Sequence, residues 1–193
     1  MHLKGALHVH TTCSDGELTI VEAVAVYREF GFDFIAFTDH DYLLQPGCYE
    51  AVRHIKTDLI IFTGVELTIF EKGYVHVNRV QGNREVLHIF NHPSELNLPL
   101  KKARQRIASV AERIPIDAVE ITTKGFLTPE FDVPEIPYPK VATDDSHTRL
   151  GCARAWVEMD CARDSDKIIH AIKHGDFWNC YARSPQFTVP NAL

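Results

Sequence analysis

The chain alternates short apolar runs with amphipathic stretches, a pattern typical of strands followed by helices. Residues 34–38 (FIAFT) and 59–63 (LIIFT) are continuous apolar runs, as expected of strands that are buried on both faces. The same pattern predicts further strands over residues 3–9, 74–80, 86–91, 118–122, 140–143, 155–159 and 177–181.

Four stretches have helical periodicity. Residues 19–30 begin with a capping-box pattern at Thr19 and Glu22 and stop at Gly31. Helices are also predicted over residues 46–56, 100–113 and 165–174. Alternating strands and helices favour a parallel sheet, either open or closed into a barrel. Residues 126–139 contain four prolines and are predicted to be the one long irregular loop, a candidate rim of a site.

Composition narrows the class of protein. The chain has 193 residues, 45% of them hydrophobic, which fits a single domain over residues 1–193 with a sizeable core. It has no apolar run long enough for a membrane span and no signal-peptide pattern. Five scattered cysteines without close pairs predict reduced thiols and a cytoplasmic location. The net charge of −6 disfavours binding to long nucleic acid, which needs a basic stripe.

Histidines and carboxylates gather at the ends of the predicted strands. His8 and His10 lie two apart in the first strand, so their side chains project to the same side, and Asp15 follows in a turn-like Ser-Asp-Gly. Sites in parallel α/β folds are built at the carboxyl ends of the strands. The strand-end set comprises His8, His10, Asp15, His40, Glu66, His76, His92, Asp145 and His147.

This set indicates bound divalent metal ions. Six imidazoles and three carboxylates buried at one rim without metal would be costly, since each ionisable group loses its hydration. Neutral imidazoles and carboxylates are the ligands of divalent cations. One tetrahedral ion takes about four ligands, so the set suits two or three ions with a bridging carboxylate. Zn, Mn and Fe all fit such ligands.

The motifs HVHTTCSDG, FTDHD, GVE, NHP and TDDSH, with His76 between the third and fourth, resemble in order and spacing those of the PHP (polymerase and histidinol phosphatase) family. Residues 144–147 read Asp-Asp-Ser-His where the family usually has Ser-Asp-Ala-His, but neither exchanged position is a ligand in the family pattern. The resemblance spans about residues 3–151 and is greatest to small stand-alone phosphoesterases. It implies an α/β fold, a distorted, TIM-like (β/α)7 barrel with a trinuclear metal centre at the carboxyl-terminal rim of the strands.

Carried onto this chain, the resemblance implies three metal positions. The first would take His8, His10, Glu66 and Asp145. The second would take Asp15, His40 and His147. The third would share Glu66 as a bridge and add His76 and His92. Asp39 is then expected to be a carboxylate that orients a ligand imidazole and so assists catalysis. Of the other histidines, His88 is interpreted as a packed interior residue rather than a substitute ligand, and the rest as surface residues: His2, His54, His170 and His174.

The implied reaction is hydrolysis of a phosphate ester by a hydroxide that the metal ions activate. Basic side chains at the rim would bind phosphate. The candidates, in order, are Arg154 and Arg149, expected to act in catalysis as well as substrate binding, and then Lys124 and Arg183. The expected substrates are small phosphomonoesters such as nucleotides, sugar phosphates or histidinol phosphate.

Three alternatives stand beside this prediction. A metal-dependent C–N hydrolase also uses His-x-His at a barrel rim, but Glu66 and Asp145-x-His147 argue against it. An exonuclease or oligonucleotide-end phosphodiesterase would differ in its products. A catalytically inactive regulatory module that binds metal would normally have lost ligands, whereas all nine positions are filled. The sequence leaves the oligomeric state open.

Overall fold

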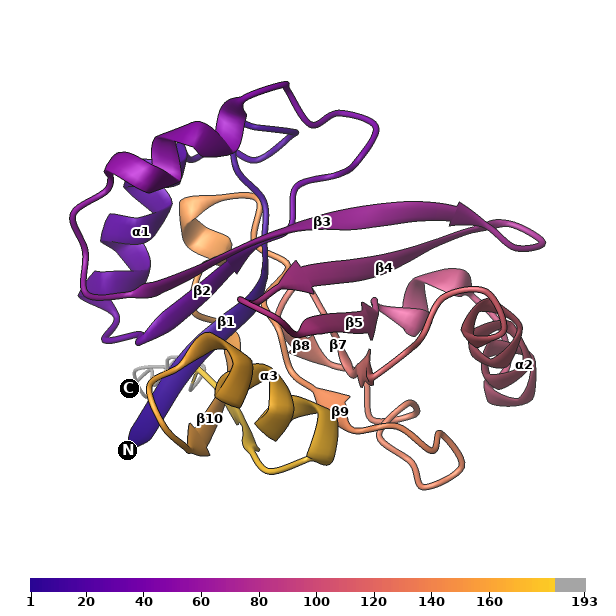
Figure 1. Cartoon of the computed structure of the whole chain (residues 1–193). Helices are drawn as coiled ribbons and strands as arrows, with labels where there is room; N and C mark the ends of the chain where they lie inside the picture. The colour runs from indigo at the N-terminus through magenta and orange to yellow at the C-terminus, as the bar shows by residue number, and fades with distance from the viewer. Residues whose placement is uncertain (183–193) are drawn as a thin grey trace, which may run out of the picture.

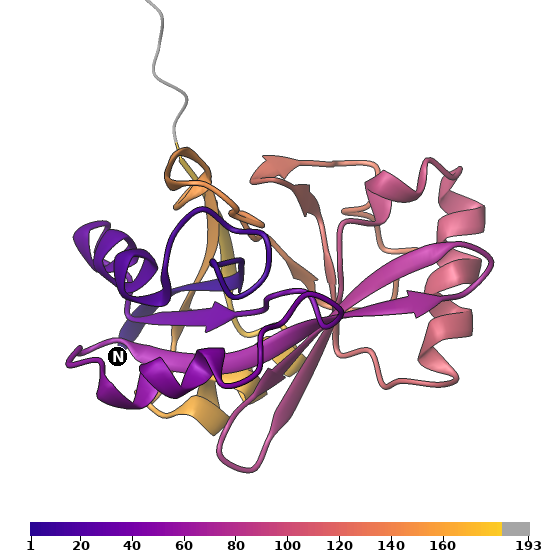
Figure 2. The same ribbon diagram turned by 90° about the horizontal axis from the view of Figure 1, so that it is seen from above.

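The computed structural model describes residues 1–182, in which nine strands form one mixed sheet that curls into a nearly closed barrel (Figures 1 and 2). In spatial order the strands are β11 (Trp178–Tyr181), β10 (Ala155–Asp160), β1 (His2–Val9), β2 (Phe34–Phe37), β3 (Ile60–Phe70), β4 (Tyr74–Gln81), β5 (Val86–Phe90), β6 (Ala118–Glu120) and β9 (Lys140–Val141). At the two edges, the amide of Asn179 accepts from Ala142 N at 2.7 Å and donates to Lys140 O at 2.8 Å. This side chain links β11 to β9, where a backbone ladder would otherwise close the barrel.

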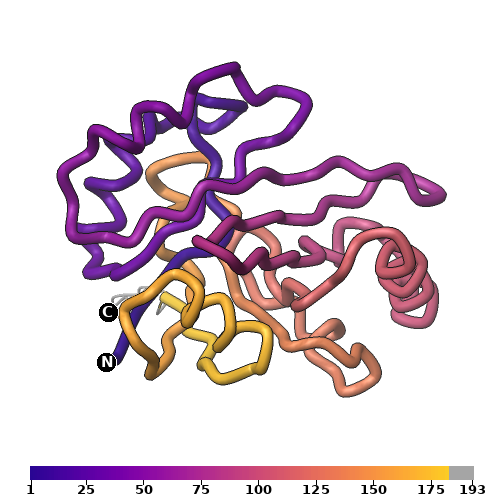
Figure 3. Tube along the Cα trace, in the orientation of Figure 1, coloured from indigo at the N-terminus to yellow at the C-terminus, as the bar shows by residue number. Residues whose placement is uncertain are grey.

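The predicted α/β barrel is confirmed, but the sheet is mixed rather than parallel. β3, β4 and β5 are antiparallel neighbours, and β10 pairs antiparallel with both β1 and β11. The turns between β3, β4 and β5 are too short for the crossover helix that a parallel pair requires. The count of seven strand–helix units is not confirmed. The β3–β4 hairpin also extends well beyond the rest of the sheet (Figures 1 and 3).

In the described part of the chain, three α-helices cover the barrel: α1 (Ile20–Glu29), α2 (Leu100–Ala111) and α3 (Ser165–His174). α1 begins as predicted, with the Thr19–Glu22 capping box formed, and packs outside β1 and β2. α2 packs outside β4 to β6, on the opposite side of the barrel (Figure 2). Short 3-10 helices are η1 (Cys48–His54), η2 (Pro93–Leu96) and η3 (Arg149–Gly151). The helix predicted over residues 46–56 is therefore only the 3-10 helix η1.

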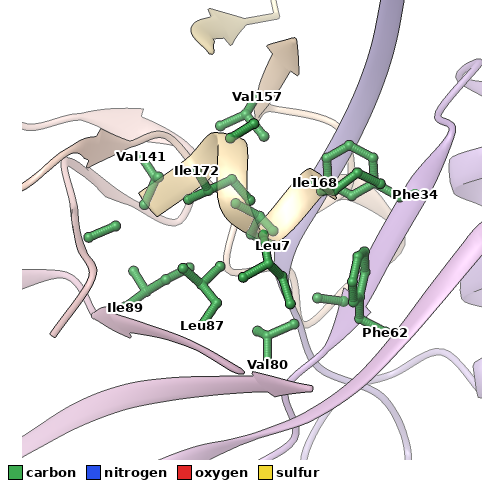
Figure 4. Close-up of a cluster of buried hydrophobic side chains, with 14 of the residues drawn as sticks. Leu7, Phe34, Phe62, Val80, Leu87, Ile89, Val141, Val157, Ile168 and Ile172 are labelled. Carbon is green, nitrogen blue, oxygen red and sulfur yellow. The ribbon is translucent and has the colours of Figure 1, made fainter. Parts of the chain in front are cut away.

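The part of the barrel interior next to α3 is apolar. α3 lies across the end at which the parallel strands begin, and Ile168 and Ile172 pack against inward residues of several strands (Figure 4). Gly5 makes room for this packing, because a Cβ there would lie 2.0 Å from the Phe34 ring. Two residues of the proline-rich loop, Phe131 and Ile136, anchor it on an apolar surface, since both are buried beside α2. Only its first residues, Phe126–Leu127, form a strand, β8, which pairs with β7 (Thr122–Thr123).

A β-bulge in β1 sets which residues face the interior. Ala6 pairs with Ile35 and Val9 with Phe37, so three steps along β1 match two along β2. Such an extra residue shifts the phase of the strand. Leu7 therefore faces the apolar interior with α3, while the next residue, His8, also turns inward and is fully buried.

The prediction of reduced thiols is wrong for two of the five cysteines. Cys13 and Cys48 form a disulfide with a Cα–Cα distance of 5.7 Å. The spacing of 35 residues conceals this pairing, because η1 brings Cys48 back against the segment after β1. The other three, Cys152, Cys161 and Cys180, are free. Within residues 1–182, no helix combines the length and hydrophobicity needed to cross a membrane.

Candidate metal centre

The nine strand-end residues lie together in one cluster at the rim of the barrel. They form four overlapping groups in which the potential ligand atoms lie within 4.8 Å of one another. The groups are His10–Asp15–His40–His147, His8–His10–Glu66, His8–His92–Asp145 and His40–Glu66–His76. No other His, Cys, Asp or Glu in the described part of the chain belongs to such a group.

Glu66 is the centre of this nine-residue cluster. Its Oε1 lies 3.4 Å from His8 Nε2 and 3.3 Å from both His76 Nδ1 and His92 Nε2. Its Oε2 lies 3.3 Å from His10 Nε2 and 2.9 Å from His40 Nδ1. Five imidazoles therefore surround one carboxylate that is only 1% exposed. A carboxylate with different imidazoles on its two oxygens is suited to bridge two cations.

Asp145 closes the deep side of the cluster. Its Oδ1 lies 3.3 Å from His8 Nε2 and 3.4 Å from His10 Nε2, and these two ring nitrogens are 3.1 Å apart. The expectation that His8 and His10 project to the same side is thus confirmed.

The outer side of the cluster faces solvent. Asp15 lies 3.4 Å from His10, 3.6 Å from His40 and 3.5 Å from His147. The side chains of Asp15, His147 and His76 are 40%, 29% and 25% exposed, whereas the other six residues of the cluster are nearly buried. A ligand from solution would therefore reach the cluster past these three side chains.

Not every residue of the cluster lies at the carboxyl end of a strand, although the sequence predicted this. His76 lies near the start of β4, not its end, and reaches the same rim because β4 runs antiparallel to β3, opposite Thr68. His92 and Asp145 have positive φ angles of 23° and 43°. Such strained conformations persist where surrounding contacts over-determine them, and they concentrate at functional sites.

Glu120 is a key residue that the sequence interpretation missed. It is 1% exposed; its Oε1 lies 3.1 Å from His8 Nδ1, and its Oε2 accepts from the His92 backbone N–H at 2.6 Å. Binding of Nδ1 directs the lone pair of His8 Nε2 toward the cluster, which is how outer carboxylates orient metal-ligating histidines. A carboxylate inside the apolar strand AVEIT was the available signal.

Asn91 is the second missed residue. Its Nδ2 donates to Glu66 Oε1 at 2.7 Å and to Asn78 Oδ1 at 2.8 Å, and both amides are buried. Asn78 also donates to Leu7 O at 3.4 Å. The two amides thus fix the central carboxylate and separate the nine-residue cluster from the apolar interior below it.

The expected role of Asp39 is corrected. Both of its oxygens are used by other groups: Oδ1 accepts from Thr11 N at 2.8 Å and Ser14 Oγ at 2.6 Å. Oδ2 accepts from Thr11 Oγ1 and Tyr49 OH, each at 2.9 Å. Asp39 is fully buried and holds the segment before Asp15, instead of orienting an imidazole.

The unusual Asp144 is likewise outside the cluster. Its Oδ2 accepts from Tyr27 OH at 2.6 Å and from Ala153 N at 2.7 Å, which ties the TDDSH segment to α1. Burial raises the pKa of the Asp144 carboxyl to about 7 despite these hydrogen bonds. Ser146 Oγ also lies 2.8 Å from Tyr27 OH, so both exchanged positions of the motif serve one anchoring network.

The charges of the cluster explain why cations suit it. Burial lowers the pKa of the His10 imidazole, but the surrounding carboxylates outweigh this and raise it to about 10. The same opposition raises the pKa of His92 to about 9. For Glu66, burial raises the pKa, and the surrounding imidazoles lower it further than burial raises it, to well below its usual range.

The ring nitrogens test the fit of a metal ion. Nδ1 of His10 and Nδ1 of His40 are buried and make no hydrogen bond of acceptable geometry within residues 1–182, although carboxylate oxygens lie 3.4 Å and 2.9 Å away. Buried imidazole nitrogens beside carboxylate oxygens match the ligand set of Zn, Mn or Fe. The residues therefore fit divalent ions.

Of the four predicted phosphate-binding residues, the structure places two, Lys124 and Arg154, beside the cluster. Lys124 and Arg154 line a hollow of about 320 Å³ together with Asp15, Asp145 and His147. Arg154 donates to Lys124 O at 3.4 Å, and its guanidinium lies 5.2 Å from the centre of the Phe126 ring. Lys124 and Gly125 both have positive φ, as the two-residue turn between β7 and β8 requires.

The prediction that Arg149 binds phosphate at the rim is not supported by its position. Arg149 points toward α1, where it pairs with Glu29 at 3.1 Å, and it does not line the hollow. Arg183 lies outside the described residues. His88 is a half-buried residue 3.6 Å from Asp117 and is not part of the cluster, in line with the interpretation that it is not a ligand.

Comparison with known proteins agrees with this geometry. The model of the PHP domain family matches residues 6–133. No protein with a curated description matches the chain in sequence. A solved two-domain protein from Bacteroides vulgatus, described as containing a predicted PHP-like metal-dependent phosphoesterase, superposes with a TM-score of 0.70 at 17% identity, over 94% of this chain and 65% of that one. PsfC from Pseudomonas syringae superposes with a TM-score of 0.66 at 11% identity, over 94% and 92% of the two chains.

Proposed function

The chain belongs to the PHP domain family, and from this premise we propose that it is a metal-dependent phosphoesterase. The observation that carries the proposal is the position of Glu66, whose carboxylate lies within 3.4 Å of ring nitrogens of five histidines. The Bacteroides protein, described as containing a predicted PHP-like metal-dependent phosphoesterase, has the same fold and supports the proposal.

We assign the nine residues to two or three ions. His8, His10, Glu66 and Asp145 would hold the first ion. Asp15, His40 and His147 would hold the second. Glu66, His76 and His92 would hold the third. Each of the four groups shares at least one histidine with another group, which supports close spacing of these ions.

Bound divalent ions would act as Lewis acids toward phosphate oxygens and would lower the pKa of water enough to make it a nucleophile near neutral pH. The chain's own residues would hold the substrate. Lys124 and Arg154 flank the hollow beside Asp15 and His147, where they can hold phosphate oxygens by charge-assisted hydrogen bonds. Glu120 would keep the His8 ring in one orientation while ions and substrate exchange.

We propose a small phosphomonoester as the substrate. The hollow of about 320 Å³ accommodates a compact group, and the net charge of −6 disfavours long nucleic acid. The presence of all nine residues in one cluster supports an enzyme rather than an inactive regulatory module.

The test is phosphate release from a panel of nucleotides, sugar phosphates and histidinol phosphate, with Mn²⁺ or Zn²⁺ added. His10→Ala should abolish release and reduce bound metal. His88→Ala, which removes a half-buried imidazole outside the cluster, should change neither. Cleavage of a labelled oligonucleotide without hydrolysis of monoesters would indicate a phosphodiesterase instead. Unchanged turnover in the His10→Ala variant would refute the metal assignment.

A further inference from the structure

A second pocket adjoins the nine-residue cluster at His76 and shares no lining residue with the hollow beside Lys124 and Arg154. It is lined by Asp41, Tyr42, Thr68, Tyr74 and His76 and has a volume of about 500 Å³. We call it the tyrosine pocket. Its size falls within the range of small-molecule sites. Its walls come from the segment after β2 and from the projecting β3–β4 hairpin (Figures 1 and 3).

The two tyrosines leave large ring surfaces facing solvent. Tyr42 and Tyr74 are 65% and 71% exposed. Tyr42 contacts the ring of His40, with centroids 5.3 Å apart, and Tyr74 meets Phe70 edge-on at 5.5 Å. Each ring therefore has a fixed neighbour on the protein side and a free surface. Aromatic rings held in this way offer stacking surfaces for a flat ligand.

The polar lining of the tyrosine pocket is also incomplete. Thr68 Oγ1 is buried and has no hydrogen-bond partner among the described residues. Asp41 is held in place, because its N–H donates to Glu66 O at 3.0 Å and its Oδ1 accepts from Tyr42 N and Thr68 N at 2.9 and 3.3 Å. A hydrogen-bonding substituent on a ligand in this pocket would supply the partner that the Thr68 hydroxyl does not find in the protein.

His76 joins the tyrosine pocket to the nine-residue cluster. Its ring lines the pocket, while its Nδ1 lies 3.3 Å from Glu66 Oε1. The hollow with Lys124 and Arg154 meets the cluster elsewhere, at Asp15, Asp145 and His147. The two openings differ in charge, since the tyrosine pocket contains a carboxylate and no lysine or arginine.

We propose that the tyrosine pocket receives the organic group of the phosphate ester, and that it selects a flat, uncharged or cationic ring with a hydrogen-bonding substituent. The inference rests on the proposed phosphoesterase function. The phosphate would lie at the cluster beside Lys124 and Arg154, and the ring would lie between Tyr42 and Tyr74. Asp41 repels an anionic group at this end.

Binding of two non-hydrolysable probes tests the pocket without turnover. Calorimetry on the metal-loaded full chain should give a Kd for phenylphosphonate about tenfold lower than for methylphosphonate, from stacking on the rings. Tyr42→Ala and Tyr74→Ala should each reduce this preference to about threefold or less. Tyr42→Phe and Tyr74→Phe should retain it, because the ring face remains. Trp178→Ala, which removes an exposed aromatic ring from β11, should leave it unchanged.

A preference that survives both alanine substitutions, or a wild-type chain that binds the two probes equally, overturns the inference. Hydrolysis of phenyl phosphate and methyl phosphate separates this failure from failure of the proposed function. Turnover of both esters with no effect of the alanine variants leaves the phosphoesterase proposal standing and removes the pocket assignment. A phenyl preference that depends on the tyrosines, in a chain that hydrolyses neither ester, supports the pocket assignment and contradicts the phosphoesterase proposal.

Discussion

The interior of this barrel has two layers with opposite chemistry, and they meet on one strand. Leu7 packs with the isoleucines of α3, whereas its neighbour His8 lies against Glu66, Asp145 and Glu120. The bulge in β1 places both inward. In the apolar layer, any well-packed hydrophobic side chain serves, because burial has no direction. In the polar layer, each nitrogen and oxygen must point to a particular partner.

The apolar layer provides stability, whereas the polar layer provides the candidate metal centre. The apolar layer buries side chains such as Phe34 and Ile168 completely and gains free energy from removing them from water. The polar layer gathers nine ionisable groups and becomes favourable only when protons or cations balance the carboxylates. Asn78 and Asn91 form the boundary between the layers. Substitutions on either side of this boundary should have separable effects.

The largest expected effect follows from Glu66→Gln, which keeps the shape of the side chain but removes its charge. Five imidazoles would lose their shared carboxylate. Phosphate release should fall on the order of 1000-fold, because Lewis-acid stabilisation is worth several kcal/mol. Bound metal, measured by mass spectrometry of the digested protein, should fall with it. Near-normal activity in this variant would show that Glu66 is not a bridge.

Leu7→Ala and His8→Ala compare the two layers at adjacent residues. Leu7→Ala leaves a cavity among fully buried side chains and should lower the free energy of unfolding by about 3 kcal/mol, with metal content unchanged. His8→Ala should reduce metal content and activity instead. Urea denaturation and metal analysis of both purified variants give the comparison. Equal loss of metal in the two variants would mean that the layers are not independent.

The disulfide tests the segment that carries Asp15. Replacing Cys13 and Cys48 together by alanine should lower the free energy of unfolding by about 4 kcal/mol, since the bond closes a loop across 35 residues. Dithiothreitol should lower the melting temperature of the wild type but not that of the double variant. Cys180→Ala provides the control of a free thiol. Titration of five free thiols in the unreduced, denatured chain would contradict the pairing.

The smallest effect is expected from Glu120→Gln. The amide can still approach His8 and His92 but no longer favours the imidazole orientation through charge. Metal affinity, measured by competition with a chelating dye, should weaken by about 10- to 100-fold, while the number of ions at saturation stays the same. An unchanged affinity would show that Glu120 acts only in packing.

Much of this cluster could be predicted because its members follow apolar runs. His40 and Glu66 follow continuous apolar runs of the sequence, and the ends of such runs are predicted to meet at one rim; in the structure His40 follows β2, whereas Glu66 lies inside β3. The capping box at Thr19 and the stop of α1 were equally local, and both were predicted correctly.

The features that the sequence did not predict depend on contacts between residues far apart in the chain. The periodicity of apolar residues carries no information about such contacts. Glu120 was overlooked because one carboxylate in a short apolar strand signals burial but not its partner 112 residues away. Asp39 was misassigned because its partners Thr11 and Tyr49 are fixed by the tertiary fold. Arg149 follows the last motif closely, yet the turn of η3 directs it to Glu29. The antiparallel course of β4, which brings His76 to the rim from the start of its strand, was likewise not contained in the apolar pattern.

Metal reconstitution tests the central claim most directly. The full chain is stripped with a chelator, then titrated with Mn²⁺ or Zn²⁺ while bound ions per chain and phosphate release are measured in the same samples. We expect no release from the stripped chain, and activity that rises as ions bind and saturates at two or three ions per chain. Full activity in the stripped chain, or saturation with fewer than one ion per chain, would contradict the assignment of the nine residues around Glu66.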